Sequence, residues 1–323
     1  MRAWQVRELG EPRDVLALAS VPDPEPGPGQ VLVRVLGAAA NFPDVLMCRG
    51  QYQVRPPLPF TPGIELCGEV VGDGAQGFSA GDRVLGGAAL PAGAFGELAL
   101  MNAVLPAPDG LDDAEAAAFF ITYQTGWFGL HRRARLAPGE TLLVHAAAGG
   151  VGSGAVQLGK AAGARVIGVV GGQDKARLAE QLGADVVVDR YQEDFVAVVK
   201  EVTHGRGANV VYDPVGGEAF RKSTKCIAFE GRILVVGFAS GDIPVAALNH
   251  ALVKNYDILG LQARTYRFVE NEATREHYAA LLKLTETGAV KTVVTERLSL
   301  DDVPDGLRRL GAGTTTGRIV FIP

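Results

Sequence analysis

The sequence predicts an α/β protein with two domains: an antiparallel, barrel-like domain and a doubly wound parallel sheet. Up to about residue 105, short alternating segments such as QVLVRVLG and ELCGEVVG lie between turn-forming stretches such as PDPEPGPG. Many short strands between Gly- and Pro-rich turns are typical of antiparallel barrels. From residue 141, uniformly apolar strands alternate with helical segments, and this pattern indicates a parallel sheet covered by crossover helices.

Each element follows from its local pattern. The segment 112–134 has an acidic start and a basic end, which suits a helix and its dipole. The expected strands of the barrel-like domain are residues 4–8, 30–37, 65–72, 82–87 and 96–101. The expected strands of the parallel sheet are residues 141–146, 164–171, 184–189, 208–216, 231–239 and 256–262.

The alternation of strands and helices stops after residue 262. The segment 276–288 has apolar residues at helical spacing, and the segments 292–300 and 316–323 resemble closing strands. We therefore expect the tail to pack back on the first domain, which would then be discontinuous. The predicted domains are residues 1–120 with 263–323, and residues 121–262.

Composition excludes several classes of protein. The 323 residues are 47% hydrophobic and 21% charged, with a formal charge of −5, which predicts a globular protein without a nucleic-acid or anionic-lipid partner. We expect no signal peptide and no membrane span, because charged residues or glycines interrupt every apolar run. Three scattered cysteines favour a reducing compartment over a disulfide framework. The chain is expected to be a cytoplasmic enzyme.

A cofactor loop is the strongest local signal. In residues 141–163 an apolar strand runs into AAAGGVG, with Ala147, Gly149 and Gly152 at the spacing of a dinucleotide-binding fingerprint, and a helix follows at once. Small residues are needed because the turn is tight, the backbone approaches a pyrophosphate, and the helix lies close to the strand. The N–H groups at the start of that helix, including those of Gly150 and Val151, would hold the phosphates.

The end of the next strand distinguishes the two nicotinamide cofactors. An NAD site usually has Asp or Glu there to bind the ribose 2′-hydroxyl, whereas this sequence has Gly171 and Gly172, followed by Asp174 and Lys175. A lysine would attract the 2′-phosphate of NADPH. Lys175 as an ordinary solvated residue, and Asp174 as a ribose ligand, are the alternatives. NADPH is favoured over NADH.

Several segments together resemble the medium-chain dehydrogenase/reductase superfamily. They are NFPD, RGQY and PPLPFTPGIE in the first domain, and AAAGGVG and DPVGG in the second. The similarity is to the zinc-free quinone oxidoreductase branch, which includes zeta-crystallin, and it covers essentially the whole chain. It implies a GroES-like β-barrel catalytic domain, a Rossmann domain with strand order 3-2-1-4-5-6, and a homodimer.

The resemblance also predicts that no catalytic zinc is bound. Where zinc alcohol dehydrogenases of this superfamily have Cys-x-x-Asp and Gly-His-Glu, this chain has Asn41-Phe-Pro-Asp44 and Gly63-Ile64-Glu65. An amide and an isoleucine replace the thiolate and the imidazole, which are the usual zinc ligands. Chemistry is then left to NADPH, which can pass a hydride to a quinone or to an α,β-unsaturated carbonyl compound.

The resemblance assigns roles to residues of both domains. Asn41 would lie near the nicotinamide ribose and offer an amide donor, and Asp44 and Glu65 would brace the loop. Tyr52 would either donate a hydrogen bond or proton to substrate or form an aromatic wall. Cys48 is expected to be inert, because a free cysteine usually behaves as a small buried hydrophobe. Further cofactor contacts are expected from Thr125, Gly171, Lys175, Tyr191, Phe238, Ser240 and Arg318.

Two other functions remain open at this stage. Reduction of enoyl thioesters would use the same residues with a longer acyl carrier. An NADPH-binding protein with a structural or RNA-binding role is the second alternative, although the sequence contains no clustered basic patch.

Overall fold

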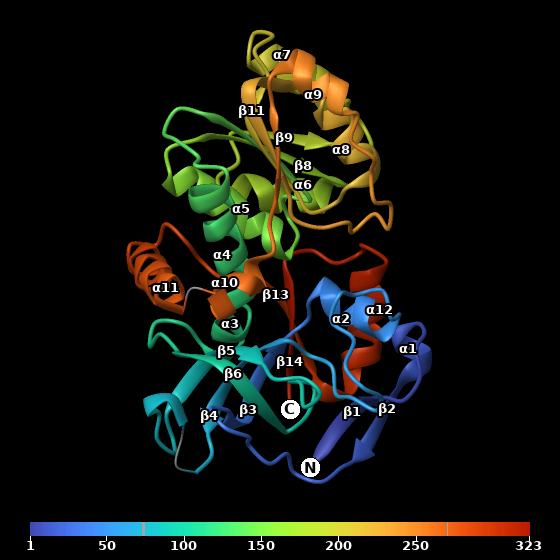
Figure 1. Cartoon of the computed structure of the whole chain (residues 1–323), viewed down its shortest axis with the longest axis vertical. Coiled ribbons are helices and arrows are strands. Elements are labelled where there is room, and N and C mark those ends of the chain that lie inside the picture. The colour runs from blue at the N-terminus through green and yellow to red at the C-terminus, as the bar shows by residue number, and fades with distance from the viewer. Residues whose placement is uncertain (73–74, 270) are drawn as a thin grey trace. The chain divides into compact units, whose positions relative to one another are not determined.

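The chain folds into two compact units, seen in a computed structural model that describes residues 1–72, 75–269 and 271–323 (Figure 1). The first unit contains residues 1–121 and 292–323, and the second contains residues 122–291. The first domain is therefore discontinuous, but the chain returns to it at residue 292 and not at the expected residue 263. Residues after 262 pack within the second unit, where the ring of Tyr266 stacks on Phe128 with centroids 4.0 Å apart.

The first unit is built on an antiparallel barrel. Strands β3, β4, β5 and β6 pair in that order, and β3 also pairs with β6, which closes the sheet. Strands β14 and β13 extend the sheet beyond β3, and β1 and β2 form a separate two-stranded sheet. The strands are β1 (Arg2–Val6), β2 (Leu16–Ser20), β3 (Val31–Ala39), β4 (Glu65–Val70), β5 (Arg83–Ala88), β6 (Leu98–Pro106), β13 (Val294–Ser299) and β14 (Arg318–Ile322).

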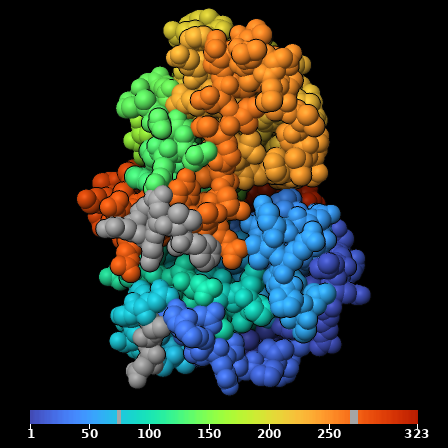
Figure 2. Space-filling view, in the orientation of Figure 1, coloured from blue at the N-terminus to red at the C-terminus, as the bar shows by residue number. Residues whose placement is uncertain are grey.

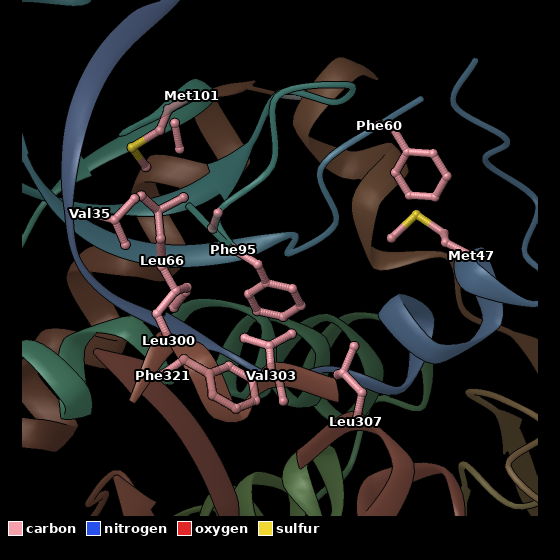
Figure 3. Close-up of a cluster of buried hydrophobic side chains, with 14 of the residues drawn as sticks. Val35, Met47, Phe60, Leu66, Phe95, Met101, Leu300, Val303, Leu307 and Phe321 are labelled. Carbon is pink, nitrogen blue, oxygen red and sulfur yellow. The ribbon is translucent and has the colours of Figure 1, made fainter. Parts of the chain in front are cut away.

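Short helices and a hydrophobic core complete this unit. The core joins residues of the N-terminal barrel to residues of the C-terminal tail, and Figure 3 shows Phe95 beside Phe321, whose rings meet edge to face at 5.3 Å. Burial of large aromatic side chains such as these stabilises the return of the chain. The helices are α1 (Pro12–Val15), α2 (Phe42–Cys48), α3 (Asp113–Ala117) and α12 (Val303–Gly311), with the 3-10 turns η1 (Ala75–Gly77) and η3 (Leu300–Asp302).

The second unit is a six-stranded parallel sheet with the order β12-β11-β10-β7-β8-β9. Counted along the chain from β7, this is the 3-2-1-4-5-6 order of a Rossmann domain, as predicted. Strand order reverses between β7 and β10, and ligands of such sheets bind at the carboxyl ends of the strands there. The strands are β7 (Thr141–His145), β8 (Arg165–Val170), β9 (Val186–Asp189), β10 (Ala208–Asp213), β11 (Ile227–Val235) and β12 (Asp257–Gly260).

Helices flank the sheet of the second unit (Figure 1): α5 (Gly150–Ala161), α6 (Gln173–Gln181), α7 (Phe195–Val202), α8 (Gly217–Ser223) and α9 (Leu248–Lys254). Two further helices, α10 (Ala263–Val269) and α11 (Asn271–Glu286), follow the last strand of the sheet and pack against each other. The single helix expected over 112–134 is instead three pieces: α3, then α4 (Phe120–Trp127), then the π-helix η2 (Phe128–Arg133). Helix α3 ends because Ala118 leaves helical geometry, with ψ at 2°.

Within the described ranges, no helix combines the length and the apolar character that crossing a bilayer requires.

Candidate functional site

A buried polar cluster lies in the barrel unit where three strand ends meet. Strand β3 ends at Ala39, and its antiparallel neighbours β4 and β14 begin beside that end, at Glu65 and Arg318. Asn41 lies two residues after the end of β3 and is the N-cap residue of helix α2. Antiparallel pairing thus brings together three side chains that are far apart in sequence. We call Asn41, Asp44, Glu65 and Arg318 the polar cluster.

Glu65 is the centre of the polar cluster. Its Oε2 accepts a hydrogen bond from Arg318 Nη2 at 2.5 Å, and its Oε1 accepts one from the Ile121 backbone N–H at 2.6 Å. Neither side chain reaches solvent appreciably, because Glu65 is 0% and Arg318 is 3% exposed. A carboxylate this deeply buried requires a compensating cation, and Arg318 supplies it. Glu65 therefore braces the cluster, as expected.

Asp44 ties two loops together. Its Oδ2 accepts a hydrogen bond from the backbone N–H of Asn41 at 2.8 Å, and its Oδ1 accepts one from Gly63 at 3.1 Å. The side chain is fully buried, and burial raises its pKa to about 7, against the two N–H groups, which lower it. We expected Asp44 among the cofactor-binding residues. In the structure both oxygens of its carboxylate accept hydrogen bonds from backbone N–H groups.

The amide of Asn41 is oriented by its neighbours. Its Nδ2 donates to Ala39 O at 3.1 Å and to Glu65 Oε2 at 3.0 Å, while its Oδ1 accepts from Arg318 Nη2 at 3.1 Å. Because an amide nitrogen carries two hydrogens, both are used within the cluster. Of the polar atoms of Asn41, Oδ1 therefore has the greater capacity for a further partner, and the expected role as a donor to the cofactor stays a prediction.

Other sequence-predicted residues of the barrel unit lie outside this cluster. Tyr52 is half-buried and packs against the hydrophobic core of the unit, which leaves both of its expected roles open. Cys48 is fully buried, and burial raises the pKa of its thiol to about 12. A thiol with so high a pKa is a poor nucleophile, in agreement with the inert role expected for it.

The dinucleotide loop of the second unit, residues 146–152, is shaped by close backbone contacts. It connects β7 to α5, and Ala146 has the left-handed φ of 50°. A Cβ atom built on Gly152 would lie 2.0 Å from Ala146 O, and one built on Gly149 would lie 3.2 Å from the same atom. Glycine is therefore required at 152, as in the fingerprint of dinucleotide sites. Helix α5 begins at Gly150 with its N–H groups at the loop.

The end of β8 has the features expected of a site for the 2′-phosphate. The carboxylate of Asp174 forms an exposed ion pair with Arg177, and its alternative role as a ribose ligand stays a prediction. Asp189, at the end of the neighbouring β9, accepts hydrogen bonds from the backbone N–H of Gly172 at 2.9 Å and of Tyr191 at 3.1 Å. Lys175 is half-buried on the first turn of α6.

Arg190 is the residue at this strand end that the sequence analysis missed. A Cβ atom built on Gly171 would lie 3.1 Å from Arg190 Nε and Nη2 and 3.1 Å from Tyr191 Cε2. Arg190 Nη2 also donates to Tyr191 Oη at 3.2 Å. The sequence feature that could have identified Arg190 is its position directly before Tyr191 in the segment VVVDRYQED.

Three expected cofactor contacts lie elsewhere in the second unit. Thr125 is half-buried in α4, whose Gly126 packs against Leu158 of α5. Phe238 and Ser240 follow β11 and lie against the turn after β10, since Cβ atoms built on Gly216 and Gly217 would meet them at 2.8 and 2.9 Å. The structure thus places these two residues beside the DPVGG segment, at the carboxyl end of the sheet.

Two known sequence families match the chain. Residues 27–109 match the family described as the alcohol dehydrogenase GroES-like domain, and residues 150–286 match the family described as zinc-binding dehydrogenase. The two matches agree with the predicted fold class, a GroES-like domain and a nucleotide-binding dehydrogenase domain.

The polar cluster does not fit the zinc ion in the second description. A guanidinium already neutralises Glu65, and the amide nitrogen of Asn41 donates to that carboxylate. Zinc sites are built from converging thiolate, imidazole and carboxylate groups, and the described part of the chain contains no group of three or more such side chains able to hold a metal. Arg318 supplies the buried positive charge here.

Full-length relatives narrow the family. The quinone oxidoreductase-like protein 2 homolog of Nematostella vectensis is 38% identical over 99% of this chain and 88% of its own length. A phenolphthiocerol/phthiocerol polyketide synthase of Mycobacterium tuberculosis is 34% identical over 95% of this chain and 14% of its own length. The structure is similar to that of Escherichia coli quinone oxidoreductase complexed with NADPH, with a TM-score of 0.92, 30% identity and full coverage of both chains. The chain therefore belongs to the medium-chain dehydrogenase/reductase superfamily, in its quinone oxidoreductase-like branch.

Proposed function

We propose that this protein is an NADPH-dependent, metal-independent reductase that acts on quinones or α,β-unsaturated carbonyl compounds. The end of β8 carries this proposal, because the position that is acidic in NAD-binding sites is Gly171 here, and the guanidinium of Arg190 and the ring of Tyr191 lie beside it. The similarity to a quinone oxidoreductase solved with NADPH supports the same cofactor.

The residues of the second unit fit that cofactor. The backbone of residues 147–152, whose tight turn requires glycine at 152, would bind the pyrophosphate, and the N-terminus of α5 would attract its charge. Gly171, Lys175 and Tyr191 would bind the adenosine 2′-phosphate, and Thr125, Phe238 and Ser240 are proposed as further contacts. NADPH supplies a hydride, and a proton from solvent completes the reduction of a quinone to a hydroquinone.

The barrel unit would contribute hydrogen-bonding groups. We propose that Asn41 accepts a hydrogen bond from the cofactor through its remaining Oδ1 lone pair, because both of its amide hydrogens are used internally. Arg318 was expected as a cofactor contact. Through its ion pair with Glu65 and its hydrogen bond to Asn41 Oδ1, it would mainly orient the amide of Asn41. Tyr52 would donate a hydrogen bond to the carbonyl oxygen of the substrate.

NADPH oxidation measured against a panel of ortho- and para-quinones, enones and enoyl-CoA esters tests this function. We expect turnover of quinones or enones with NADPH and weaker activity with NADH. Binding of NADPH without turnover of any panel member would contradict the reductase activity. A Tyr52→Phe variant should lose kcat/KM with the preferred substrate, and an unchanged kcat/KM would make Tyr52 an aromatic wall.

Enoyl thioesters form a second candidate substrate class. One relative is a polyketide synthase subunit, and a segment of it, 14% of its length, matches 95% of this chain. Preference for enoyl-CoA esters over quinones by at least about tenfold in kcat/KM, a difference of ~1.4 kcal/mol in transition-state stabilisation, would favour this class.

We further propose that the protein is a homodimer formed through the second unit. Strand β12 is an edge of the parallel sheet, and edge strands commonly pair with another chain. Large apolar side chains between β11 and β12 are exposed, in the orange segment visible in Figure 2: Ile243 (70%), Val245 (90%), Leu248 (75%), Leu252 (78%) and Val253 (78%). Light scattering should give a dimer mass for the wild type and a monomer mass for Leu252→Glu. A monomeric wild type would contradict the proposal, and Leu18→Glu in the barrel unit is the control.

A reducing, cytoplasmic location is consistent with the cysteines, since Cys48, Cys67 and Cys226 are all free and buried.

A further inference from the structure

Arg190 lies where a phosphate on the adenosine ribose would be bound. It follows β9 directly, and its backbone N–H donates to Val170 O at 3.0 Å, so it lies beside the last residue of β8. Its side chain folds back over Gly171, because a Cβ atom on that glycine would be 3.1 Å from both Nε and Nη2. Gly171 follows the second strand of the sheet unit, which is where Rossmann domains meet the adenosine ribose.

The aromatic ring of Tyr191 supports the guanidinium. The Arg190 carbon Cζ lies 5.1 Å from the ring centroid, which is the range of a cation–π contact. Nη2 also donates to the phenol oxygen, and this hydrogen bond is the main cause of a lowered Tyr191 pKa. These contacts leave other N–H groups of the planar guanidinium for a further acceptor.

Positive charge is concentrated at this strand end. Burial lowers the pKa of Lys175, and the positive charge of Arg190 lowers it further, so the two cations repel each other at short range. Among the described residues no carboxylate forms an ion pair with Arg190. The nearby acids are engaged otherwise: Asp174 with Arg177, and Asp189 Oδ1 with two backbone N–H groups. A dianionic phosphate would relieve the repulsion between the cations.

We propose that Arg190 is a second cationic ligand of the 2′-phosphate of NADPH, acting with Lys175, and that it determines the preference for the phosphorylated cofactor. This inference rests on the proposed function, which gives NADPH as the cofactor. A guanidinium offers two parallel N–H groups to a phosphate, whereas the ammonium of Lys175 acts as a point charge.

Calorimetric binding of adenosine 2′,5′-bisphosphate and of AMP to the full chain tests the proposal without any turnover. The wild type should bind the bisphosphate more tightly than AMP. Arg190→Ala should weaken the bisphosphate by roughly 10- to 100-fold, the range for a hydrogen bond to a charged group, and leave AMP affinity unchanged. Arg177→Ala is the matched control. Arg177 lies on α6, the helix of Lys175, but forms an ion pair with Asp174, so this variant should keep the wild-type preference for the bisphosphate.

The outcomes separate the two proposals. A wild type that binds both ligands equally would contradict NADPH as the cofactor. A wild type that prefers the bisphosphate, with an Arg190→Ala variant that keeps this preference or loses affinity for both ligands equally, would overturn the role of Arg190 alone. Unchanged AMP affinity also shows that the variant is folded. Arg190→Gln, which retains an N–H donor near Tyr191 without the charge, should lose the same preference.

Discussion

The polar cluster of the barrel unit and the dinucleotide loop of the sheet unit differ in what determines their geometry: side-chain contacts in the cluster, and close backbone packing in the loop. In the cluster, side chains make the defining contacts, since Glu65, Arg318 and Asn41 form hydrogen bonds with one another and are almost closed to solvent. In the loop, the absence of side chains is what matters, because Ala146 O lies where a Cβ atom on Gly152 would be. The cluster should therefore be sensitive to removal of a group, and the loop to addition of one.

Replacing Arg318 with Met should have the largest effect on stability. The change leaves the Glu65 carboxylate buried without its cation, which costs roughly 3–5 kcal/mol in the free energy of unfolding. Urea unfolding followed by fluorescence measures this loss. The double variant Glu65→Gln with Arg318→Met removes both charges and should recover much of it.

An exposed ion pair provides the control. Arg34 and Glu69 are 3.0 Å apart with side chains 61% and 39% exposed, and Arg34→Met should cost less than about 1 kcal/mol. Equal losses for Arg318→Met and Arg34→Met would show that burial does not distinguish the cluster from the surface.

Adding a methyl group to the loop should have the next largest effect. Gly152→Ala places Cβ 2.0 Å from Ala146 O, so the backbone must shift, at a cost of roughly 2–4 kcal/mol, and NADPH binding should be lost with it. Gly149→Ala places its Cβ at 3.2 Å from the same oxygen and should keep most of the affinity. Calorimetric titration with NADPH compares the two variants. Similar affinities for both would mean that the close contact does not shape the phosphate site.

The same difference explains what the sequence could predict. The loop depends on small residues at fixed local spacing, so the fingerprint AAAGGVG and its place between a strand and a helix were sufficient. The order of the six parallel strands followed from the family resemblance. Asn41 and Asp44 could be singled out because they also occupy one short motif.

Contacts between distant residues could not be predicted in the same way. Arg318 is 253 residues from Glu65 in sequence, and only the pairing of β14 with β3 brings it there. The stacking of Tyr266 on Phe128 is another contact between residues far apart in sequence, and it lies within the second unit, which extends to residue 291. The position of Arg190 over Gly171 depends on a side-chain conformation, which no local pattern encodes.

The two units should also respond to pH in opposite directions, because each buries an ionisable group. Burial raises the pKa of Asp44 to about 7, so its contribution to stability is present at low pH and is lost as pH rises through 7. Burial lowers the pKa of His145, whose Nε2 lies 2.8 Å from Ser223 Oγ. Its contribution is present above the ordinary pKa of about 6.5 and is lost as pH falls below that value.

The two tryptophans allow this smallest effect to be measured in each unit separately. Trp4 lies in the barrel unit and Trp127 in the sheet unit, so Trp127→Phe and Trp4→Phe proteins report on one unit each. The free energy of unfolding followed by Trp4 should fall by up to about 2–3 kcal/mol between about pH 5 and pH 8. Asp44→Asn should abolish this dependence on pH at the cost of one hydrogen bond. The Trp127 signal should show the reverse slope, removed by His145→Gln. A barrel slope that persists in Asp44→Asn would assign the titration to another group and separate the stability of the cluster from the protonation of Asp44.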